Sequence, residues 1–215
     1  MRVRKMKNGA ARFSACGDMI IKPNAENPEK IDVYALFPGF KRFRLEIGCG
    51  KGKFVCGESE RNPDVAYIAV ELVSDVIIHA AEAAIELGRD NVKFVNANAK
   101  LLPQLFDEGT FERIHINFCD PWPKSRHEKR RLTYREFLLK FKPLLIDGGC
   151  IAFKTDNAGL FEYSLPEFEA AGFEIRELTR DLHNSEYFGC DTETEYEKNF
   201  SQKGMPINRL VAIKA

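Results

Sequence analysis

The sequence predicts an α/β fold in which a mostly parallel sheet is covered by helices on both faces. Two observations predict it. Short apolar runs of strand length alternate with helix-length segments along most of the chain. A glycine-rich turn at residues 48–52 directly follows an apolar run, as ligand-binding turns do in open sheets of this class. The length, 215 residues, suffices for one well-buried domain.

The composition is that of a globular protein that does not enter a membrane. Hydrophobic residues make up 44% and charged residues 30% of the chain, and no apolar run approaches the roughly 18 residues of a membrane span. The six cysteines form no Cys-x-x-Cys pair, which predicts neither a zinc site nor a disulfide framework, so no metal is expected. The same cysteine pattern fits a reducing compartment best, so a cytoplasmic location is expected. The basic start, residues 1–7, lacks the apolar core of a secretory signal.

The charges are segregated, although the formal net charge is zero. Basic residues dominate 1–12 and 124–142, whereas acidic residues dominate 162–198. A polyanion could bind the basic segments, because local potential and not the total charge sets such a contact. We expect residues 1–40 to form a basic N-terminal arm, partly ordered with one short helix, and residues 41–215 to form the folded domain.

Before residue 100 the pattern alternates between strand and helix. We expect strands at 43–47, 65–70 and 91–95, a helix from Lys53 and another over 74–87. Ser74 is expected to cap the second helix and Gly88 to end it, because serine is a favoured N-cap and glycine adopts the left-handed turn that closes a helix.

After residue 110 the alternation continues. A strand over 113–118 leads to Asp120, at the kind of strand end where open α/β sheets bind ligands. Thr133–Glu136 has the pattern of a capping box and is expected to open a helix over 133–145. The remaining elements expected are a strand at 150–154, a helix at 158–171, a strand at 173–178, a polar insertion at 181–206 and a last strand at 207–214.

The glycine-rich turn and two acids indicate a nucleotide-type cofactor site. The turn reads Gly-x-Gly-x-Gly through Gly48, Gly50 and Gly52, with Glu46 before it. Glu71 ends the next strand, where a doubly wound fold places the acid that binds a ribose diol. The dinucleotide fingerprint separates its second and third glycines by two residues, whereas one residue separates them here. S-adenosylmethionine has an ammonium and a sulfonium but no pyrophosphate, so it suits this tighter turn and its acid better.

Asn98 follows the third expected strand and has two interpretations. It could hold the edge of adenine, because its amide group is both donor and acceptor. It could equally be a turn asparagine bonded to its own backbone.

Residues 118–131 are the most distinctive stretch of the chain. They contain Asp120, the single tryptophan, Trp122, and a dense basic run from Lys124 onward. Such cations are typical of phosphate contacts, which supply affinity without reading sequence. Trp122 could stack on a base, but a packed wall of the loop is the favoured interpretation.

This stretch resembles the signature of the bacterial tRNA (guanine-N7)-methyltransferases, Asp-Pro-Trp-Pro-Lys followed by Arg-His-x-Lys-Arg-Arg. The resemblance extends in order to 46–52, Glu71, Thr155-Asp156 and Thr194–Glu197, over roughly residues 43–214. It implies a Rossmann-like class I methyltransferase fold, with a mostly parallel seven-stranded sheet and an antiparallel last strand. It also implies methyl transfer from S-adenosylmethionine to N7 of a guanine in the variable loop of tRNA.

The resemblance further implies a role for individual residues, with Asp120 as the catalytic one. Asn98 stands where the family usually has Asp. The residues implied to bind S-adenosylmethionine are Glu46, Gly48, Gly50, Glu71, Asn98 and Asp120. Those implied to bind the substrate are Lys124, Asp156, Thr194, Glu195, Tyr196 and Glu197. Those implied to contact RNA are Arg126, His127, Lys129, Arg130 and Arg131. With tRNA as its partner, the protein is expected to act as a monomer or homodimer.

The chemistry of such a reaction accounts for the carboxylates. Guanine N7 already has a lone pair, so the work is to align it with the methyl group and not to create a nucleophile. The product base carries positive charge, which a nearby carboxylate, first of all Asp120, would stabilise. Asp156 and Glu197 could accept hydrogen bonds from the ring N–H and exocyclic amine of guanine.

Other functions remain compatible with parts of the pattern. Asp120-Pro-Trp-Pro123 is also similar to the loop of amino-directed methyltransferases, which act on nucleic acid or protein. Cys119 could serve as a cytosine-directed nucleophile, but a convincing Pro-Cys motif is missing. A nicotinamide dehydrogenase is disfavoured by the glycine spacing. A non-catalytic RNA-binding module would explain the basic run, yet it has no use for Glu46, the glycine turn and Glu71 together.

Overall fold

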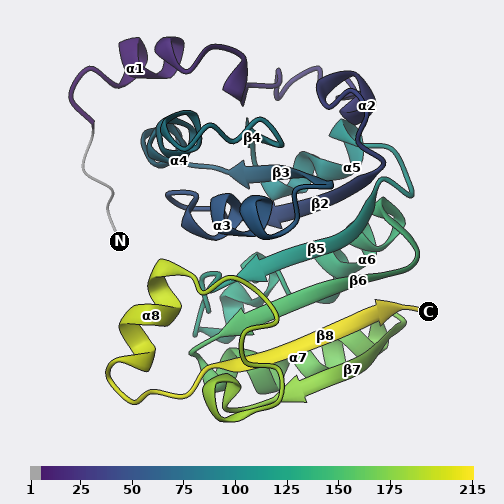
Figure 1. Ribbon diagram of the computed structural model, residues 1–215. Helices are drawn as coiled ribbons and strands as arrows, with labels where there is room; N and C mark the ends of the chain where they lie inside the picture. The colour runs from purple at the N-terminus through teal and green to yellow at the C-terminus, as the bar shows by residue number, and fades with distance from the viewer. Residues whose placement is uncertain (1–5) are drawn as a thin grey trace. The chain divides into compact units, whose positions relative to one another are not determined.

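The computed structural model describes residues 6–215, so residues 1–5 of the expected basic arm lie outside the described part. The chain divides into two compact units, Met1–Leu105 and Phe106–Ala215. Figure 1 shows the strands and helices of both units in chain order. Each unit is described by itself below.

The first unit carries a parallel sheet of order β1-β4-β3-β2. Its strands are β1 (Ile20–Ile21), β2 (Arg42–Ile47), β3 (Val65–Glu71) and β4 (Val92–Asn96). Its helices are α1 (Gly9–Ala15), α2 (Val33–Leu36), α3 (Lys53–Arg61), α4 (Ser74–Glu86) and α5 (Leu102–Leu105), with 3-10 turns η1 (Gly17–Met19) and η2 (Ala99–Leu101). Successive β3 side chains from Val65 to Val70 are all buried, as expected of a strand covered on both faces.

Residues 6–40 contain more regular structure than the single short helix that was expected. The helix α1 packs on α4, where the Arg12 guanidinium pairs with Glu82 and the Met6 amide donates to Asp75 at 3.0 Å. The two-residue strand β1 pairs with β4. A two-residue strand is too short to leave a period in the sequence, which explains why it was not predicted.

The second unit carries a mixed sheet of order β5-β6-β8-β7. Its strands are β5 (Phe111–Asn117), β6 (Leu145–Thr155), β7 (Phe173–Thr179) and β8 (Asn208–Lys214). Its helices are α6 (Arg135–Phe141), α7 (Ala158–Ala170) and α8 (Glu195–Ser201), with 3-10 turns η3 (Ser125–Arg130), η4 (Lys142–Leu144) and η5 (Leu182–Asn184).

The last strand, β8, runs antiparallel to both of its neighbours, as the resemblance implied. β5 and β6 are parallel, and their register places Asn117 beside Lys154. On the other side of β6, Lys154 faces Arg209 of β8. Three strand ends that carry polar residues therefore lie next to one another in this unit.

Two expected helix caps are wrong. The N-cap of α4 is Val73, and the Ser74 hydroxyl donates instead to Asn96 Oδ1 at 2.8 Å. The helix α6 begins only at Arg135 and has no side-chain cap, because Thr133 is buried with its Oγ1 2.7 Å from Ser164 Oγ. In both places the hydroxyl meets a tertiary partner, the Asn96 amide oxygen or the Ser164 hydroxyl, in place of the local backbone bond that the pattern predicted.

The expected end of α4 is confirmed. Gly88 follows the helix with φ +63°, and the Arg89 amide reaches back to the Ala84 carbonyl at 2.9 Å. Among the described residues, no helix has the length and apolar character needed to cross a bilayer. The same residues contain no group of three or more His, Cys, Asp and Glu side chains arranged for a metal ion.

Candidate active site

The glycine-rich loop of the first unit is held against the end of β3 by backbone bonds. The amides of Gly48 and Cys49 donate to the Val70 carbonyl at 2.8 and 3.1 Å. Gly52 has φ +81°, and a Cβ there would lie 2.8 Å from the Cβ of Ala80 in α4. At Gly50, which has φ +56°, nothing lies within 4 Å of such an atom. Gly52 thus permits helix packing, whereas Gly50 leaves the backbone open to a ligand.

Glu71 joins this loop to the turn after β3. Its carboxylate accepts from the Gly50 amide at 3.2 Å and from the Val73 amide at 2.9 Å. Each oxygen retains a further lone pair, so the side chain is oriented and still able to accept from a ligand hydroxyl. The predicted relation between the glycine loop and this acid is present in the structure.

Asn96 is a residue of this region that the sequence reasoning missed. Its amide nitrogen donates to the carbonyls of Glu71 and Leu72 at 2.9 and 3.2 Å, and its carbonyl accepts from Ser74. It thereby fixes the turn that carries Glu71. A polar residue ending a buried strand was the available signal, because such a group needs partners.

The two other acceptors expected here differ in burial. Glu46 lies on β2 opposite Ala69 and is only 2% exposed. Asn98 is exposed, and its carbonyl accepts from the Lys100 amide at 2.9 Å. The local turn contact, one of the two interpretations of Asn98, is therefore present.

The residues of the first unit fit S-adenosylmethionine on their own geometry. An open backbone at Gly48 and Gly50 and an oriented carboxylate at Glu71 meet at one loop. Carboxylates suit a ligand that carries ammonium, sulfonium and diol groups, whereas a pyrophosphate would be repelled by them.

In the second unit, Asp120 sits on a loop with unusual backbone angles. Among the described residues, three that are not glycine have positive φ, and two of them, Phe118 (+50°) and Trp122 (+40°), flank Asp120. The Phe118 amide donates to the Lys154 carbonyl at 2.9 Å, which ties the loop to β6. Asp120 itself is exposed. Such angles persist only where surrounding contacts impose them, and they are characteristic of functional loops.

Arg131 and Arg130 support this loop. Arg131 donates to the carbonyls of Pro121 and Trp122, both at 3.0 Å, and its guanidinium lies 4.1 Å from the ring centre of Tyr163. Arg130 lies 4.9 Å from the ring of Trp122. The basic run is therefore divided, since Arg131 is half-buried and serves the loop.

The rest of the run is mostly exposed. Lys124, Arg126 and Lys129 point their charge to solvent, while the His127 ring meets Trp122 edge to face at 5.8 Å. Trp122 contacts Arg130 and His127, which agrees with the favoured interpretation of a packed loop residue.

The Cys119 thiol is not disposed to act as a nucleophile. Burial, and secondarily the Asp120 charge, raises its pKa to about 12. Since the thiolate is the reactive form, this environment disfavours the cytosine-directed alternative.

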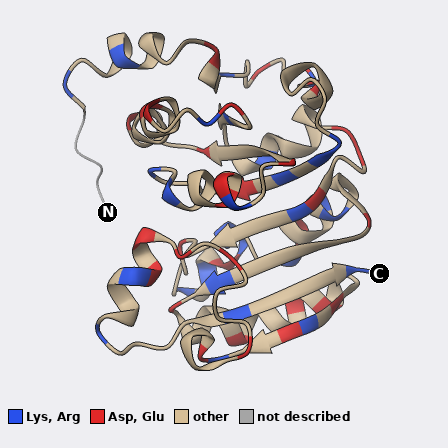
Figure 2. Cartoon of the chain, in the orientation of Figure 1, with Lys and Arg blue, Asp and Glu red and all other residues tan. Residues whose placement is uncertain are grey.

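The Thr194–Glu197 segment forms the N-terminus of α8. The Glu197 amide donates to Thr194 Oγ1 at 2.9 Å, and the Thr194 amide donates to Glu197 Oε2 at 3.3 Å, which makes a capping box. Glu197 is 3% exposed, and its Oε2 lies 2.9 Å from Lys154 Nζ. Glu197 thus has partners inside the protein, where an acceptor facing guanine was expected. Figure 2 shows that the ribbon of α8 carries both acidic (red) and basic (blue) residues.

Tyr196, in the same segment, is the exposed member of an aromatic group. The residue is 54% exposed, and its ring centre lies 5.4 Å from that of Phe118 and 4.9 Å from that of Phe200. Asp156, beyond the end of β6, is half-buried. Phe118 thus brings the Asp120 loop into contact with the Thr194–Glu197 segment within this unit.

Asp191 anchors the insertion that carries α8. Its carboxylate lies 3.2 Å from Arg113 and 3.5 Å from Arg209. Burial alone would raise the pKa of Asp191, but the charges of His115, Lys154, Arg113 and Arg209 outweigh it and lower the pKa to about 2. The sequence contained no local sign of this cluster, because Asp191 lies in the insertion and its cationic partners lie on β5, β6 and β8.

The comparisons with known proteins decide the family. The family described as "Putative methyltransferase" matches residues 41–210. A tRNA (guanine-N(7)-)-methyltransferase of Lachnoclostridium phytofermentans is 39% identical over 214 residues, covering 100% of this chain and 99% of that protein. Proteins of the same name are 41% identical in Streptococcus pneumoniae, over 99% of both chains, and 47% identical in Bacillus subtilis, over 77% of both.

The chain belongs to the tRNA (guanine-N7)-methyltransferase family. The family predicted from residues 118–131 and the other matching motifs is confirmed.

Solved structures at low identity support the fold of this tRNA (guanine-N7)-methyltransferase family member. The 16S rRNA methyltransferase KamB superposes with a TM-score of 0.65 at 15% identity, covering 87% of this chain and 95% of that one. The antibiotic-resistance methyltransferase Kmr gives 0.60 at 20% identity, covering 86% and 92%. The expected Rossmann-like methyltransferase fold is confirmed, with one more strand among residues 6–215 than the seven expected.

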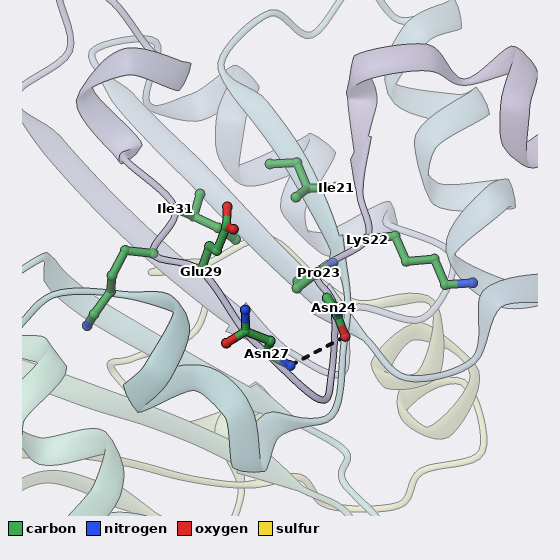
Figure 3. Close-up of a pocket in the computed structure, with 8 residues that line it drawn as sticks. Ile21, Lys22, Pro23, Asn24, Asn27, Glu29 and Ile31 are labelled. Carbon is green, nitrogen blue, oxygen red and sulfur yellow. Dashed lines mark hydrogen bonds between the residues drawn. The ribbon is translucent and has the colours of Figure 1, made fainter.

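A separate pocket of about 370 Å³ lies in the first unit of this family member (Figure 3). None of the predicted site residues lines it. The residues around it are Ile21, Lys22, Pro23, Asn24, Asn27, Glu29, Lys30 and Ile31.

Proposed function

We propose that this protein transfers the methyl group of S-adenosylmethionine to N7 of a guanine in the variable loop of tRNA. The observation that carries the proposal is the full-length similarity to proteins named tRNA (guanine-N(7)-)-methyltransferase. The contacts of Glu71 and of the Asp120 loop support it, because they orient a carboxylate beside the glycine loop and hold the loop that carries Asp120.

In this proposal the first unit binds the methyl donor. Gly48 and Gly50 let the backbone approach the ligand, and Glu71 accepts hydrogen bonds from its ribose. Glu46 neutralises a positive group, and Asn98 contacts the adenine. When bound, S-adenosylmethionine supplies an electrophilic methyl group on a sulfonium.

Asp120 is the proposed catalytic residue. It contacts the methyl donor and stabilises the positive charge that develops on guanine as N7 is methylated. No strong base is needed, since N7 already presents a lone pair. The contacts of Phe118 and Arg131 support a fixed position for Asp120, which lowers the cost of organising the charge.

Guanine is selected in the second unit by Asp156 and by the segment from Thr194 through Glu195 and Tyr196 to Glu197. Asp156 accepts hydrogen bonds from the base. Its carboxylate lies just beyond the end of β6 and, unlike that of Glu197, does not take part in a helix cap. Glu197, which caps α8 and pairs with Lys154, orders the segment that meets the substrate. Tyr196 presents an exposed ring able to stack on a base.

The tRNA backbone is contacted by the basic run. Lys124, Arg126 and Lys129 bind phosphates, and His127 and Arg130 contribute beside Trp122. Arg131 acts chiefly by holding the loop. We further propose that residues 41–215 work as one methyltransferase domain, in the cytoplasm, as a monomer or homodimer.

The deciding experiment is incubation of the full-length protein with methyl-labelled S-adenosylmethionine and unmodified tRNA, followed by nucleoside analysis. The expected product is 7-methylguanosine at a variable-loop position. Label in an exocyclic amine would favour the amino-directed alternative, and binding of tRNA without transfer would favour the RNA-binding module.

A further inference from the structure

Lys154 contacts two of the three segments proposed to hold the methyl acceptor and lies two residues from the third. Its backbone carbonyl accepts from the Phe118 amide at 2.9 Å, at the start of the Asp120 loop. Its ammonium lies 2.9 Å from Glu197 Oε2 and 3.3 Å from the Thr192 carbonyl. Asp156 follows it two residues later on the same strand end.

The ion pair of Lys154 is buried on both sides. The Lys154 and Glu197 side chains are 3% and 4% exposed. A buried ion pair is weak evidence for stability, because apolar residues of similar volume often serve as well. It does fix geometry, since an ammonium must meet its acceptors at hydrogen-bond distance.

Glu197 transmits that geometry to the substrate segment. The oxygen that meets Lys154 also accepts the Thr194 amide in the capping box of α8. Tyr196 lies between Thr194 and Glu197 in the sequence, and its ring contacts that of Phe118. A shift of the Glu197 carboxylate would therefore move the whole segment relative to the Asp120 loop.

We propose that Lys154 is a positioning residue for the methyl acceptor. Its ammonium holds the Thr194–Glu197 segment at the distance from the Asp120 loop that the tRNA guanine requires. This inference rests on the proposed function, because it assigns the segment to the acceptor.

The test compares Lys154→Met, which removes the ammonium and keeps the length, with Lys154→Arg, which retains a charge. Lys214→Met is the matched control, because Lys214 is a strand lysine of the same sheet that also pairs with one carboxylate, Asp147 at 3.3 Å, and one carbonyl, Leu145 at 2.7 Å. We expect Lys154→Met to raise the KM for tRNA at least about tenfold with a smaller change in kcat, while the Kd for S-adenosylmethionine stays unchanged. Lys154→Arg should bring the KM for tRNA part of the way back to the wild-type value. Lys214→Met should leave the KM for tRNA and kcat unchanged.

A merely structural role would not produce this split. If Lys154→Met lowers the melting temperature but leaves the KM for tRNA unchanged, the positioning role is overturned. Adding Glu197→Gln to Lys154→Met removes the uncompensated buried charge, so this double variant should recover stability without recovering the KM. Recovery of both would also overturn the inference.

Amide hydrogen exchange separates this inference from the proposed function. Lys154→Met should lose protection over residues 194–201, with the first unit unaffected. Absence of 7-methylguanosine with the wild-type protein would defeat the proposed function, and the exchange data would still report whether Lys154 holds the segment. Unchanged protection there would overturn the inference whatever the protein methylates.

Discussion

The glycine loop of the first unit and the acidic insertion of the second unit build their candidate sites in different ways. The loop is made by backbone: three amides, at Gly48, Cys49 and Gly50, bond to the end of β3. The insertion is held by side chains, through the buried pairs of Glu197 with Lys154 and of Asp191 with two arginines. Backbone geometry depends on local sequence, whereas these pairs join residues far apart in the chain. The first kind of site can be predicted from spacing, and the second cannot.

The largest expected effect concerns Asp120. This residue belongs neither to the backbone-held glycine loop nor to the side-chain pairs of the insertion, and in the proposal it contacts the substrate itself. Asp120→Ala should lower the methyl-transfer rate about 10³-fold, as loss of a key electrostatic group does, while tRNA binding changes little. Single-turnover rates and a binding titration measure the two. Asp147→Ala is the control, since that carboxylate is fully exposed. Turnover near the wild-type rate would remove Asp120 from the mechanism. The glycine loop and the acidic insertion could then no longer be compared as supports of one reaction.

Gly52→Ala tests the backbone-made site. The new Cβ would meet Ala80 Cβ at 2.8 Å at a residue with φ +81°, so both overpacking and backbone strain apply. We expect about 3 kcal/mol lower free energy of unfolding in urea. Gly39→Ala isolates the strain, because Gly39 has φ +91° but nothing within 4 Å. That control should lose only about 1 kcal/mol. Equal losses would mean that α4 shifts to make room for the new methyl group, and that the close approach of Gly52 to Ala80 is not required for stability.

The two regions also show how far the sequence could be read. The acid at the end of β3, the glycine loop and the end of α4 at Gly88 were all predicted, because each depends on neighbours along the chain. Capping boxes show the limit. The pattern at Thr133 was predicted to cap a helix, yet a buried contact with Ser164 engages it. The pattern at Thr194 was assigned to substrate binding, yet in the structure it forms a capping box at the start of α8.

The missed residues share a physical reason. Asn96 acts through carbonyls of another strand end, and Lys154 and Arg209 act through acids of the insertion. Each is a polar residue inside a strand that otherwise reads as apolar. Such a residue indicates that a partner exists, but only the fold shows which one.

Asp191 tests the side-chain-made site through pH. Its pKa is lowered from an ordinary 3.8 to about 2, so its ionised form stabilises the folded state above the unfolded pKa. The contribution, about 2 kcal/mol, should be present at pH 6 and lost as pH falls from about 4 to about 2. Urea unfolding of wild type and Asp191→Asn should therefore differ more at pH 6 than at low pH.

Glu174→Gln is the control for that pH series. Glu174 pairs with Arg176 at 2.9 Å, but both side chains are more than half exposed. An exposed pair of this kind contributes about 0.5 kcal/mol or less. If the Asp191→Asn difference stays constant with pH, the cluster does not depend on the Asp191 charge, and the contrast between the two regions weakens.

The smallest expected effect separates the exposed cations from the one that holds the loop. Arg126→Ala with Lys129→Ala should weaken tRNA binding about tenfold at low salt and reduce the salt slope by about 1.5, because each exposed cation releases counterions from one phosphate. Arg131→Ala should instead lower turnover with little change in slope, because its guanidinium bonds to Pro121 and Trp122. Binding isotherms over a salt series measure both. A slope that falls equally in the two variants would place Arg131 on the RNA, and the loop would then depend on bound substrate for its conformation.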